Sequence, residues 1–196
     1  MNQELYLPSS ARTTPAAWLR SAGIVLTGSL LVAVCAHLAL PLFFTPVPLS
    51  LAPFAVLLLG LALTPRLAAA TLAAYLVEGA LGLPVFAPTG PAGLAHLLGP
   101  TGGFLLAYPL AALLISFLYR RTGRGFIATL ASASAGSLTI LAGGALWFAV
   151  LTHASAQQVF TLAVLPFLPG DALKVVAAAA LATGFLRLRR RAASGV

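Results

Sequence analysis

Three ionisable side chains stand inside long apolar stretches of this 196-residue sequence: Glu78, Asp171 and Lys174. An ionisable group at the centre of a membrane-spanning helix costs about 2.5–3.5 kcal/mol on insertion scales, so each one requires an explanation. Asp171 is the only aspartate of the sequence and Lys174 is its only lysine. Their spacing of three residues predicts that both side chains share one helix face, where each lowers the cost of burying the other.

This pair has a functional and a structural interpretation. A carboxylate accepts hydrogen bonds from N–H groups and an ammonium donates to carbonyl or carboxylate oxygens, so the pair suits a small ligand that offers both. In the structural interpretation, Asp171 follows Pro169-Gly170 and caps a helix, with Lys174 as its neutralising partner. Position favours the ligand site, because these are the only opposite charges in the outer half of the expected bundle.

Other polar side chains in apolar surroundings receive structural interpretations. Glu78 is expected to be a snorkelling or protonated carboxylate at the membrane interface. His37, His96 and His153 lie on separate segments without the spacing of metal ligands, so interfacial histidines are expected and no metal site.

Ser29 and Ala33 form a small-x-x-x-small pair in the first apolar run. This spacing allows a second helix to approach closely. The second helix is either a partner protein's helix or another helix of the same chain.

The composition places the chain in a lipid bilayer. It is 60% hydrophobic and 7% charged, whereas soluble domains carry roughly 25% charged residues. Because each crossing helix needs about 20 apolar residues, the length predicts one membrane domain of five to seven spans. The net charge of +8 comes from arginines outside or at the edges of the apolar runs, so they indicate topology rather than a nucleic-acid partner.

Six apolar runs are predicted to cross the membrane, and the arginines between them set the orientation. Arg20, Arg66, the 120–124 loop and the C-terminal tail are expected to share the cytoplasmic side of a bacterial inner membrane, which requires two crossings between each pair. Both termini are then cytoplasmic, with a flexible tail over about 1–15 and a basic tail over about 187–196. The runs are 21–40, 49–63, 67–83, 103–119, 126–151 and 159–185, the last interrupted at 166–170.

Enzyme activity is not expected. The glycine-rich segment 98–104 lacks the Gly-Lys-Ser/Thr of a phosphate-binding loop. The sequence also lacks the Gly-x-Ser-x-Gly frame of a serine hydrolase and any paired aspartates. Energy for transport must therefore come from a gradient or from another subunit.

Several segments, in order and spacing, resemble the BioY family, the biotin-binding S components of energy-coupling factor (ECF) transporters. The resemblance extends over about 20–187 and implies a six-helix subunit with cytoplasmic termini, an ECF S-component-like bundle that needs no cofactor. It implies biotin capture from outside and uptake with a transmembrane T component and two ABC-type ATPases. The segments are 45–50 (Thr-Pro-Val-Pro-Leu-Ser), 54–58 continuing to Pro65-Arg66, 82–87 (Gly-Leu-Pro-Val-Phe-Ala), 98–104 (Leu-Gly-Pro-Thr-Gly-Gly-Phe) and 165–174 (Leu-Pro-Phe-Leu-Pro-Gly-Asp-Ala-Leu-Lys).

The resemblance also implies roles for individual residues. Asp171 is expected to accept a ureido N–H of biotin, and Lys174 to donate to the ureido carbonyl or to the carboxylate. Further substrate contacts are expected from Phe86, Tyr108 and Gly90, with gating loops at Pro46, Pro48 and Gly102.

The sequence departs from the family pattern at several positions. Ser50 replaces a usual Thr, Ala52-Pro53 a common Gln-Thr, and Pro88-Thr89 a Gly-rich or amide-bearing loop, while Glu78 replaces an apolar residue. Ligand contacts from positions 52 and 87–90 are therefore in question. The alternatives to a biotin S component are an S component for another vitamin, a self-sufficient small carrier, and a structural membrane protein without ligand.

Overall fold

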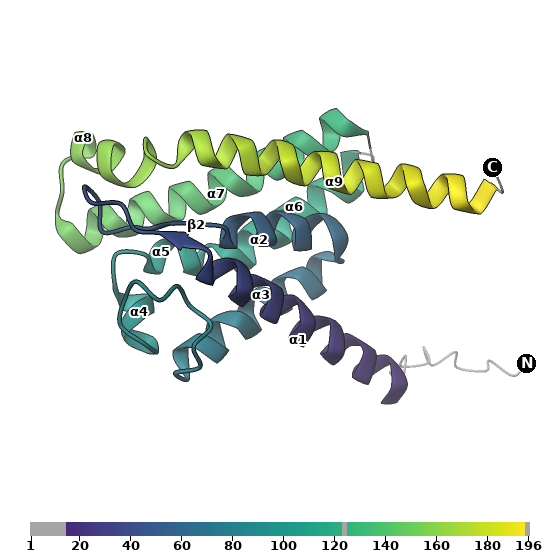
Figure 1. Ribbon diagram of the computed structural model, residues 1–196, viewed down its shortest axis with the longest axis horizontal. Helices are drawn as coiled ribbons and strands as arrows, with labels where there is room; N and C mark the ends of the chain where they lie inside the picture. Colours follow the sequence, from purple (N-terminus) through teal and green to yellow (C-terminus); the bar gives the residue numbers. More distant parts are fainter. Residues whose placement is uncertain (1–14, 123–124, 195–196) are drawn as a thin grey trace, which may run out of the picture.

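The computed structural model describes residues 15–122 and 125–194, most of which are helical. The longer helices are α1 (Pro15–His37), α2 (Ala52–Ala62), α3 (Pro65–Ala80), α6 (Tyr108–Thr122), α7 (Phe126–Thr152) and α9 (Leu168–Ser194), and α7 and α9 lie along the long axis of the molecule (Figure 1). Shorter elements connect them: α4 (Leu94–Leu98), α5 (Gly102–Leu106), α8 (Ala156–Val159), the π-helical turn η1 (Phe160–Val164), and the strands β1 (Ala39–Leu40) and β2 (Leu49–Ser50).

Local sequence signals explain several helix boundaries. Pro65 occupies the first turn of α3, where its missing N–H has no helical partner to lose. Gly82, with φ of 93°, follows α3 and reverses the chain at no steric cost. Ser155 and Gln158 form a capping box that starts α8.

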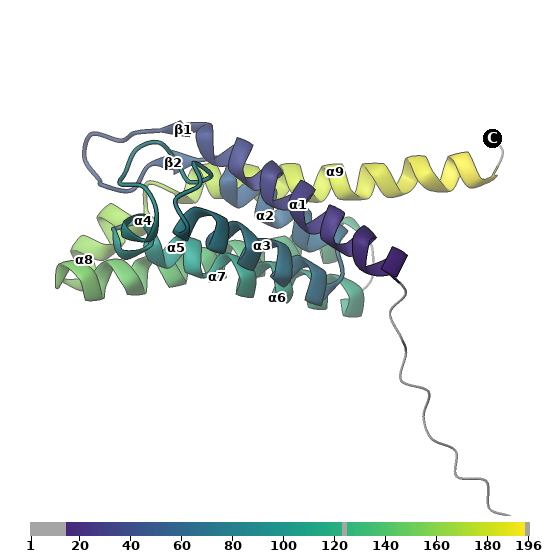
Figure 2. The ribbon, with the colours of Figure 1, turned by 90° about the horizontal axis from the view of Figure 1, so that it is seen from below.

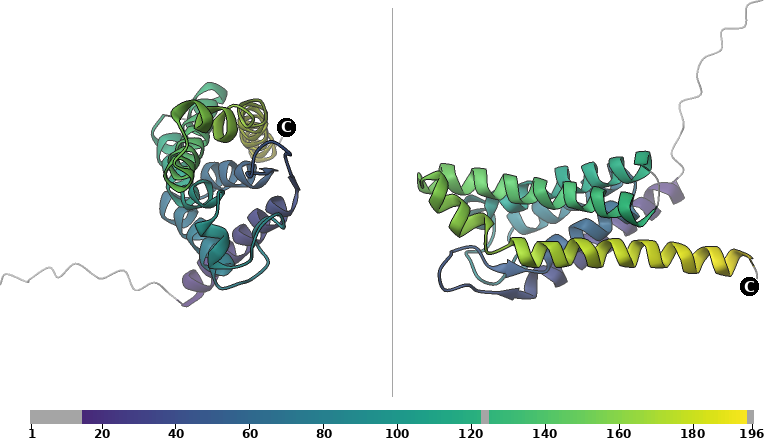
Figure 3. Two further views of the ribbon diagram at one scale, coloured as in Figure 1. Left: turned by 90° about the vertical axis from the view of Figure 1, so that its left-hand side faces the viewer. Right: turned by 90° about the horizontal axis from the view of Figure 1, so that it is seen from above.

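The helices pack into a bundle in which each contacts two or more others. α3 packs on α1 and α6, α6 also packs on α2 and α7, and α9 packs on α2 and α7. Viewed along the long axis in Figure 3, the helices surround a common interior. Glycines let α2 and α7 approach α6 closely. A Cβ at Gly60 of α2 or at Gly136 of α7 would overlap the fully buried Ile115 of α6.

The outer surface of the bundle is apolar. Large exposed side chains include Leu26, Leu138, Leu146 and Val150, and such a surface is favourable in lipid and unfavourable in water. Helical segments 16–37, 102–122, 126–152 and 168–185 are long and apolar enough to cross a membrane, and α2 is a shorter apolar helix. The chain is therefore a multi-pass membrane protein.

The connections separate into two groups along the long axis (Figures 1 and 2). The start of α1, the end of α9, and the links from α2 to α3 and from α6 to α7 lie at one end. The strands, α4 and α8 lie at the other end. Arg66 lies in the first turn of α3, and Arg120 and Arg121 lie in the last turn of α6, so these arginines belong to the same end as the start of α1 and the end of α9.

The structure differs from the expected all-α bundle in two places. Ala39 pairs with Ser50 and Leu40 with Leu49 in a short antiparallel ladder, which closes the proline-containing loop after α1. The expected interruption at 166–170 is also shorter than predicted, because α9 begins at Leu168 and includes Pro169 and Gly170 in its first turn. Proline is tolerated there because first-turn N–H groups have no helical acceptor.

Candidate ligand-binding site

A cavity lies among the helices where they meet the loop after β1. Its empty volume is about 580 Å³, counting the open solvent at its mouth. The wall is mostly apolar, with Phe104, Phe167, Ile140 and Leu141 among its residues. The polar members of the wall are Ser50, Tyr75, His96, Thr101, Tyr108, Asp171 and Lys174.

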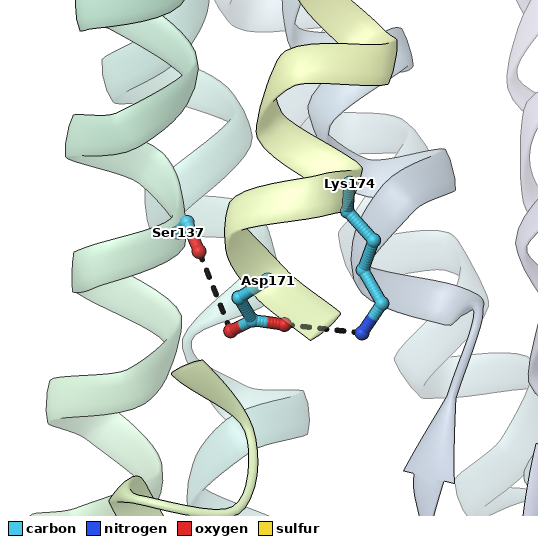
Figure 4. Close-up of polar contacts among 3 residues, drawn as sticks. All are labelled: Ser137, Asp171 and Lys174. Carbon is cyan, nitrogen blue, oxygen red and sulfur yellow. Dashed lines mark hydrogen bonds and ion pairs between the residues drawn. The ribbon is translucent and has the colours of Figure 1, made fainter. Parts of the chain in front are cut away.

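Asp171 and Lys174 form a buried ion pair at this wall (Figure 4). Lys174 Nζ donates to Asp171 Oδ1 at 3.0 Å, and Ser137 Oγ of α7 donates to Asp171 Oδ2 at 3.4 Å. Asp171 is 7% exposed and Lys174 is 9% exposed. In such apolar surroundings each charge depends on the other, because an isolated buried charge carries a large desolvation cost.

The capping interpretation of Asp171 does not match this geometry. The backbone N–H of Asp171 already donates to Phe167 O at 2.8 Å, so the residue is inside the first turn of α9 rather than at its cap. Within 15–122 and 125–194, its carboxylate bonds to Ser137 and Lys174 and to no backbone N–H. The helix start still favours the negative charge through its dipole.

Aromatic rings form a second part of the site. The rings of Tyr75 and Tyr108 stack with centroids 6.4 Å apart, and Phe86 meets Tyr75 edge-on at 5.4 Å. Tyr108 lines the cavity as a predicted contact residue should. Phe86 requires a correction, because it is buried behind Tyr75, against Gly79, and is not among the cavity-lining residues.

Sequence reasoning did not single out Tyr75 or Ser137, and it assigned His96 to the membrane interface. Tyr75 and His96 are buried residues of the cavity wall, and His96 Nδ1 bonds to Pro91 O at 2.9 Å. The available signal for Tyr75 was its place on the buried face of α3, which repeats at helical spacing through Ala68, Leu72 and Gly79. No comparable signal marks Ser137, which is one of several small residues on α7.

The predicted gating positions have different environments. Pro48 lines the cavity, whereas Pro46 is exposed beside it. The loop that carries them is anchored by Thr45, whose Oγ1 donates to Leu162 O at 2.8 Å. Gly102 is buried at the start of α5, where a Cβ would overlap the backbone of Leu97, and its gating role stays a prediction.

Gly90 also requires a correction as a substrate contact. It is exposed and is not among the cavity-lining residues. A Cβ at this position would lie 3.1 Å from the His96 ring, which is tighter than ordinary van der Waals contact. The absence of a side chain therefore lets the loop pass close to His96.

The expected partner-helix contact is an internal one. Ser29 and Ala33 are buried, and Ser29 Oγ donates to Glu78 Oε1 of α3 at 2.9 Å. The small face of α1 thus packs on α3, which is the internal one of the two alternatives that the spacing left open. The same bond gives Glu78, which is half-buried, a partner inside the chain.

The positions where the sequence departs from the family pattern are part of the wall. Ser50, Ala52, Pro53 and Ala87 all line the cavity. Ala52 and Pro53 present only apolar atoms to a ligand. At these departures from the family pattern, only Ser50 brings a side-chain hydrogen-bonding group to the wall.

The fold is that of an ECF transporter S component. The chain superposes with a TM-score of 0.79 on a solved structure described as the S-component for biotin from an ECF-type ABC transporter. The two are 24% identical, and the match covers 90% of this chain and 94% of the other. At this identity the likeness establishes the fold alone.

The family follows from the sequence. The BioY family model matches residues 7–191, and the chain belongs to the BioY family, which confirms the resemblance seen in the motifs. It is 40% identical over 137 residues to a probable biotin transporter BioY of Pyrococcus horikoshii, covering 70% of this chain and 79% of that one. It is 35% identical over 160 residues to the biotin transporter BioY of Thermotoga maritima, covering 82% and 90%.

Removing one member of the ion pair should destabilise the protein more than removing both. Lys174→Met leaves the Asp171 carboxylate buried with Ser137 alone, a change that typically costs about 3–5 kcal/mol. Adding Asp171→Asn removes the stranded charge, so the double variant should recover most of the loss. Melting temperatures of the detergent-solubilised, unliganded proteins measure both effects. Equal melting temperatures for the single and double variants would contradict the pair's mutual dependence.

Proposed function

We propose that this chain is the substrate-binding S component of a biotin uptake transporter. The observation that carries the proposal is the buried Asp171–Lys174 pair at the wall of a cavity, in a chain of the BioY family. The relatives are named as biotin transporters, in agreement with a transport subunit rather than an enzyme. Biotin is the transported ligand in this proposal and no cofactor takes part.

Biotin's chemistry matches the cavity. Its ureido ring has two N–H donors and one carbonyl acceptor, its sulfur ring is apolar, and its valerate chain ends in a carboxylate. Asp171 accepts a ureido N–H, and Lys174 keeps donors beyond its bond to Asp171 for an oxygen of the ligand. Tyr108 supplies an apolar ring face, and Phe86 acts through Tyr75, whose ring it packs against.

The proposed topology has six crossings, by α1, α2, α3, α6, α7 and α9, in the cytoplasmic membrane of a bacterium. The arginines at the ends of α3 and α6 support it, because positive residues near span ends favour the cytoplasmic side. Both termini are then cytoplasmic. The loop that carries Pro48 borders the cavity on the outer side and closes over the ligand.

A transmembrane T component and two ABC-type ATPases supply the driving force in this proposal. The sequence contains no phosphate-binding loop of the Gly-Lys-Ser/Thr type. Its S-component fold is shared with a structure from an ECF-type ABC transporter. The surface that meets the T component is not Ser29 and Ala33, since α3 covers them.

Purified protein should bind biotin, and the binding should depend on the buried pair. Asp171→Asn should weaken binding by about ten-fold or more, because hydrogen bonds to charged groups contribute roughly 1.5–3 kcal/mol. Glu78→Gln is the matched control, since it makes the same carboxylate-to-amide change outside the cavity and should leave affinity unchanged. Equilibrium binding of labelled biotin is the measurement. Absence of saturable binding would overturn the function, whereas full binding by Asp171→Asn would overturn only the site.

Single cysteines placed at the two ends of the bundle should react with a maleimide from opposite sides of the membrane. The native Cys35 is buried and can be replaced by serine. In that background, His153→Cys should react with a membrane-impermeant maleimide in intact cells, because α7 ends there on the outer side. Thr122→Cys, at the end of α6, should react only after permeabilisation. The reverse pattern, or labelling of both in intact cells, would contradict the topology.

Biotin accumulation should require the coupling subunits. Cells without their own biotin synthesis and uptake should accumulate labelled biotin when this chain is expressed with a T component and ATPases. Replacing the phosphate-loop lysine of the ATPases should abolish accumulation while binding to this chain persists. Concentrative uptake by the chain alone would favour the self-sufficient carrier.

A further inference from the structure

The loop between β1 and β2, residues 41–48, forms part of the cavity wall and lies beside the connection from α8 to α9 (Figure 1). Val47 and Pro48 line the cavity, and Val47 is buried. Thr45 and Val47 each precede a proline, which biases both residues toward extended backbone and stiffens the segment. We expect the segment that faces the cavity to move as one unit.

A single side-chain hydrogen bond joins this loop to the segment that precedes α9. Thr45 Oγ1 donates to Leu162 O at 2.8 Å and also accepts from the Val47 N–H at 3.3 Å. Within 15–122 and 125–194, no other hydrogen bond links the loop to a segment beyond its two flanking strands. The buried Thr45 hydroxyl thus orders the turn and fixes it to the neighbouring segment.

The Leu162 carbonyl is available to Thr45 because the helical turn around it supplies no donor. In an α-helix this carbonyl would accept from the residue four positions later, but that residue is Pro166, which has no N–H. The N–H groups on either side of Pro166, those of Leu165 and Phe167, donate to other carbonyls at 2.8 and 3.0 Å. Backbone carbonyls away from water nearly always have a donor, and here the Thr45 hydroxyl supplies it.

The bond connects two sides of the cavity without itself belonging to the wall. Thr45 and Leu162 are not among the cavity-lining residues. On one side Thr45 holds Val47 and Pro48, and on the other Leu162 precedes Phe167, which lines the cavity. Both bonded atoms belong to the chain, so the bond can hold the loop in place without contacting a ligand.

We propose that the hydrogen bond from Thr45 to Leu162 is the latch of the cavity entrance and breaks each time a ligand enters or leaves. The inference rests on the proposed function, in which this loop closes over biotin. Thr45 is then a positioning residue that acts through Val47 and Pro48. Such a latch slows entry and exit by the same factor, because the same opening precedes both. The equilibrium affinity is therefore nearly independent of it.

Thr45→Val tests the latch, because it replaces the hydroxyl with a methyl group and keeps the branched shape of the side chain. Loss of one hydrogen bond should increase the population of the open loop about five-fold. The association and dissociation rates of biotin should both rise by about this factor, while the dissociation constant changes by less than about two-fold. Rapid mixing with labelled biotin, and its chase with unlabelled biotin, measure the two rates on detergent-solubilised protein. Thr45→Ser keeps the hydroxyl and should retain the wild-type rates.

Thr161→Val is the matched control, because Thr161 belongs to η1 and its hydroxyl donates to the carbonyls of Gln157 and Gln158 just before it. It should change neither rate. A faster dissociation alone, with weaker binding, would overturn the latch, since Thr45 would then hold the ligand rather than the entrance. Unchanged rates in Thr45→Val would also overturn it, as would a serine variant as fast as the valine variant. Wild-type protein that binds no biotin would instead overturn the proposed function itself, which separates the two failures.

Discussion

A carboxylate and an ammonium held 3.0 Å apart inside a bundle of apolar helices persist only when their surroundings satisfy both. In this protein, neighbouring groups stabilise the charges of the pair. The first turn of α9 favours the negative charge of Asp171, and Ser137 of α7 donates to its second oxygen. Lys174 is one helical turn further along the same face. The Ser137 contact therefore depends on the packing of α9 against α7, and a shift of either helix would separate Ser137 from Asp171.

That packing in turn depends on elements outside the site. Thr45 ties the loop after β1 to the carbonyl of Leu162 just before α9, and Trp147 Nε1 ties α7 to the carbonyl of Gly99. Gly103 allows α5 to approach α7 so closely that a Cβ would overlap Trp147. In a membrane there is little hydrophobic force between helices, so close contact and interhelical hydrogen bonds must hold them. These contacts hold the loop after β1 and α5 against the helices that form the cavity wall.

The sequence was sufficient for those features that follow from composition and charge. Apolar runs, arginine positions and the Asp171–Lys174 spacing predicted a multi-pass membrane protein with a buried pair on one helix face, and the described structure contains both. Features that depend on three-dimensional packing were missed. Nothing local distinguishes Ser137 from the other small residues of α7, and the partner of Ser29 lies 49 residues away on α3. Phe86 belongs to a motif near the site, but packing places it against Gly79 and outside the cavity wall.

Glu78 and Asp171 show why an ionisable residue in an apolar span is only a first indication of a site. Both carboxylates accept a hydrogen bond from a serine on a neighbouring helix. Glu78 is half-buried between α1 and α3, and the cavity does not reach it. Asp171 is at the cavity wall and forms an ion pair with Lys174, which also lines the cavity. The Lys174 ammonium has further N–H donors beyond its bond to Asp171. A ligand with a polar group beside the pair can accept from these donors, whereas a purely apolar ligand of the same size cannot, and this difference is a source of selectivity.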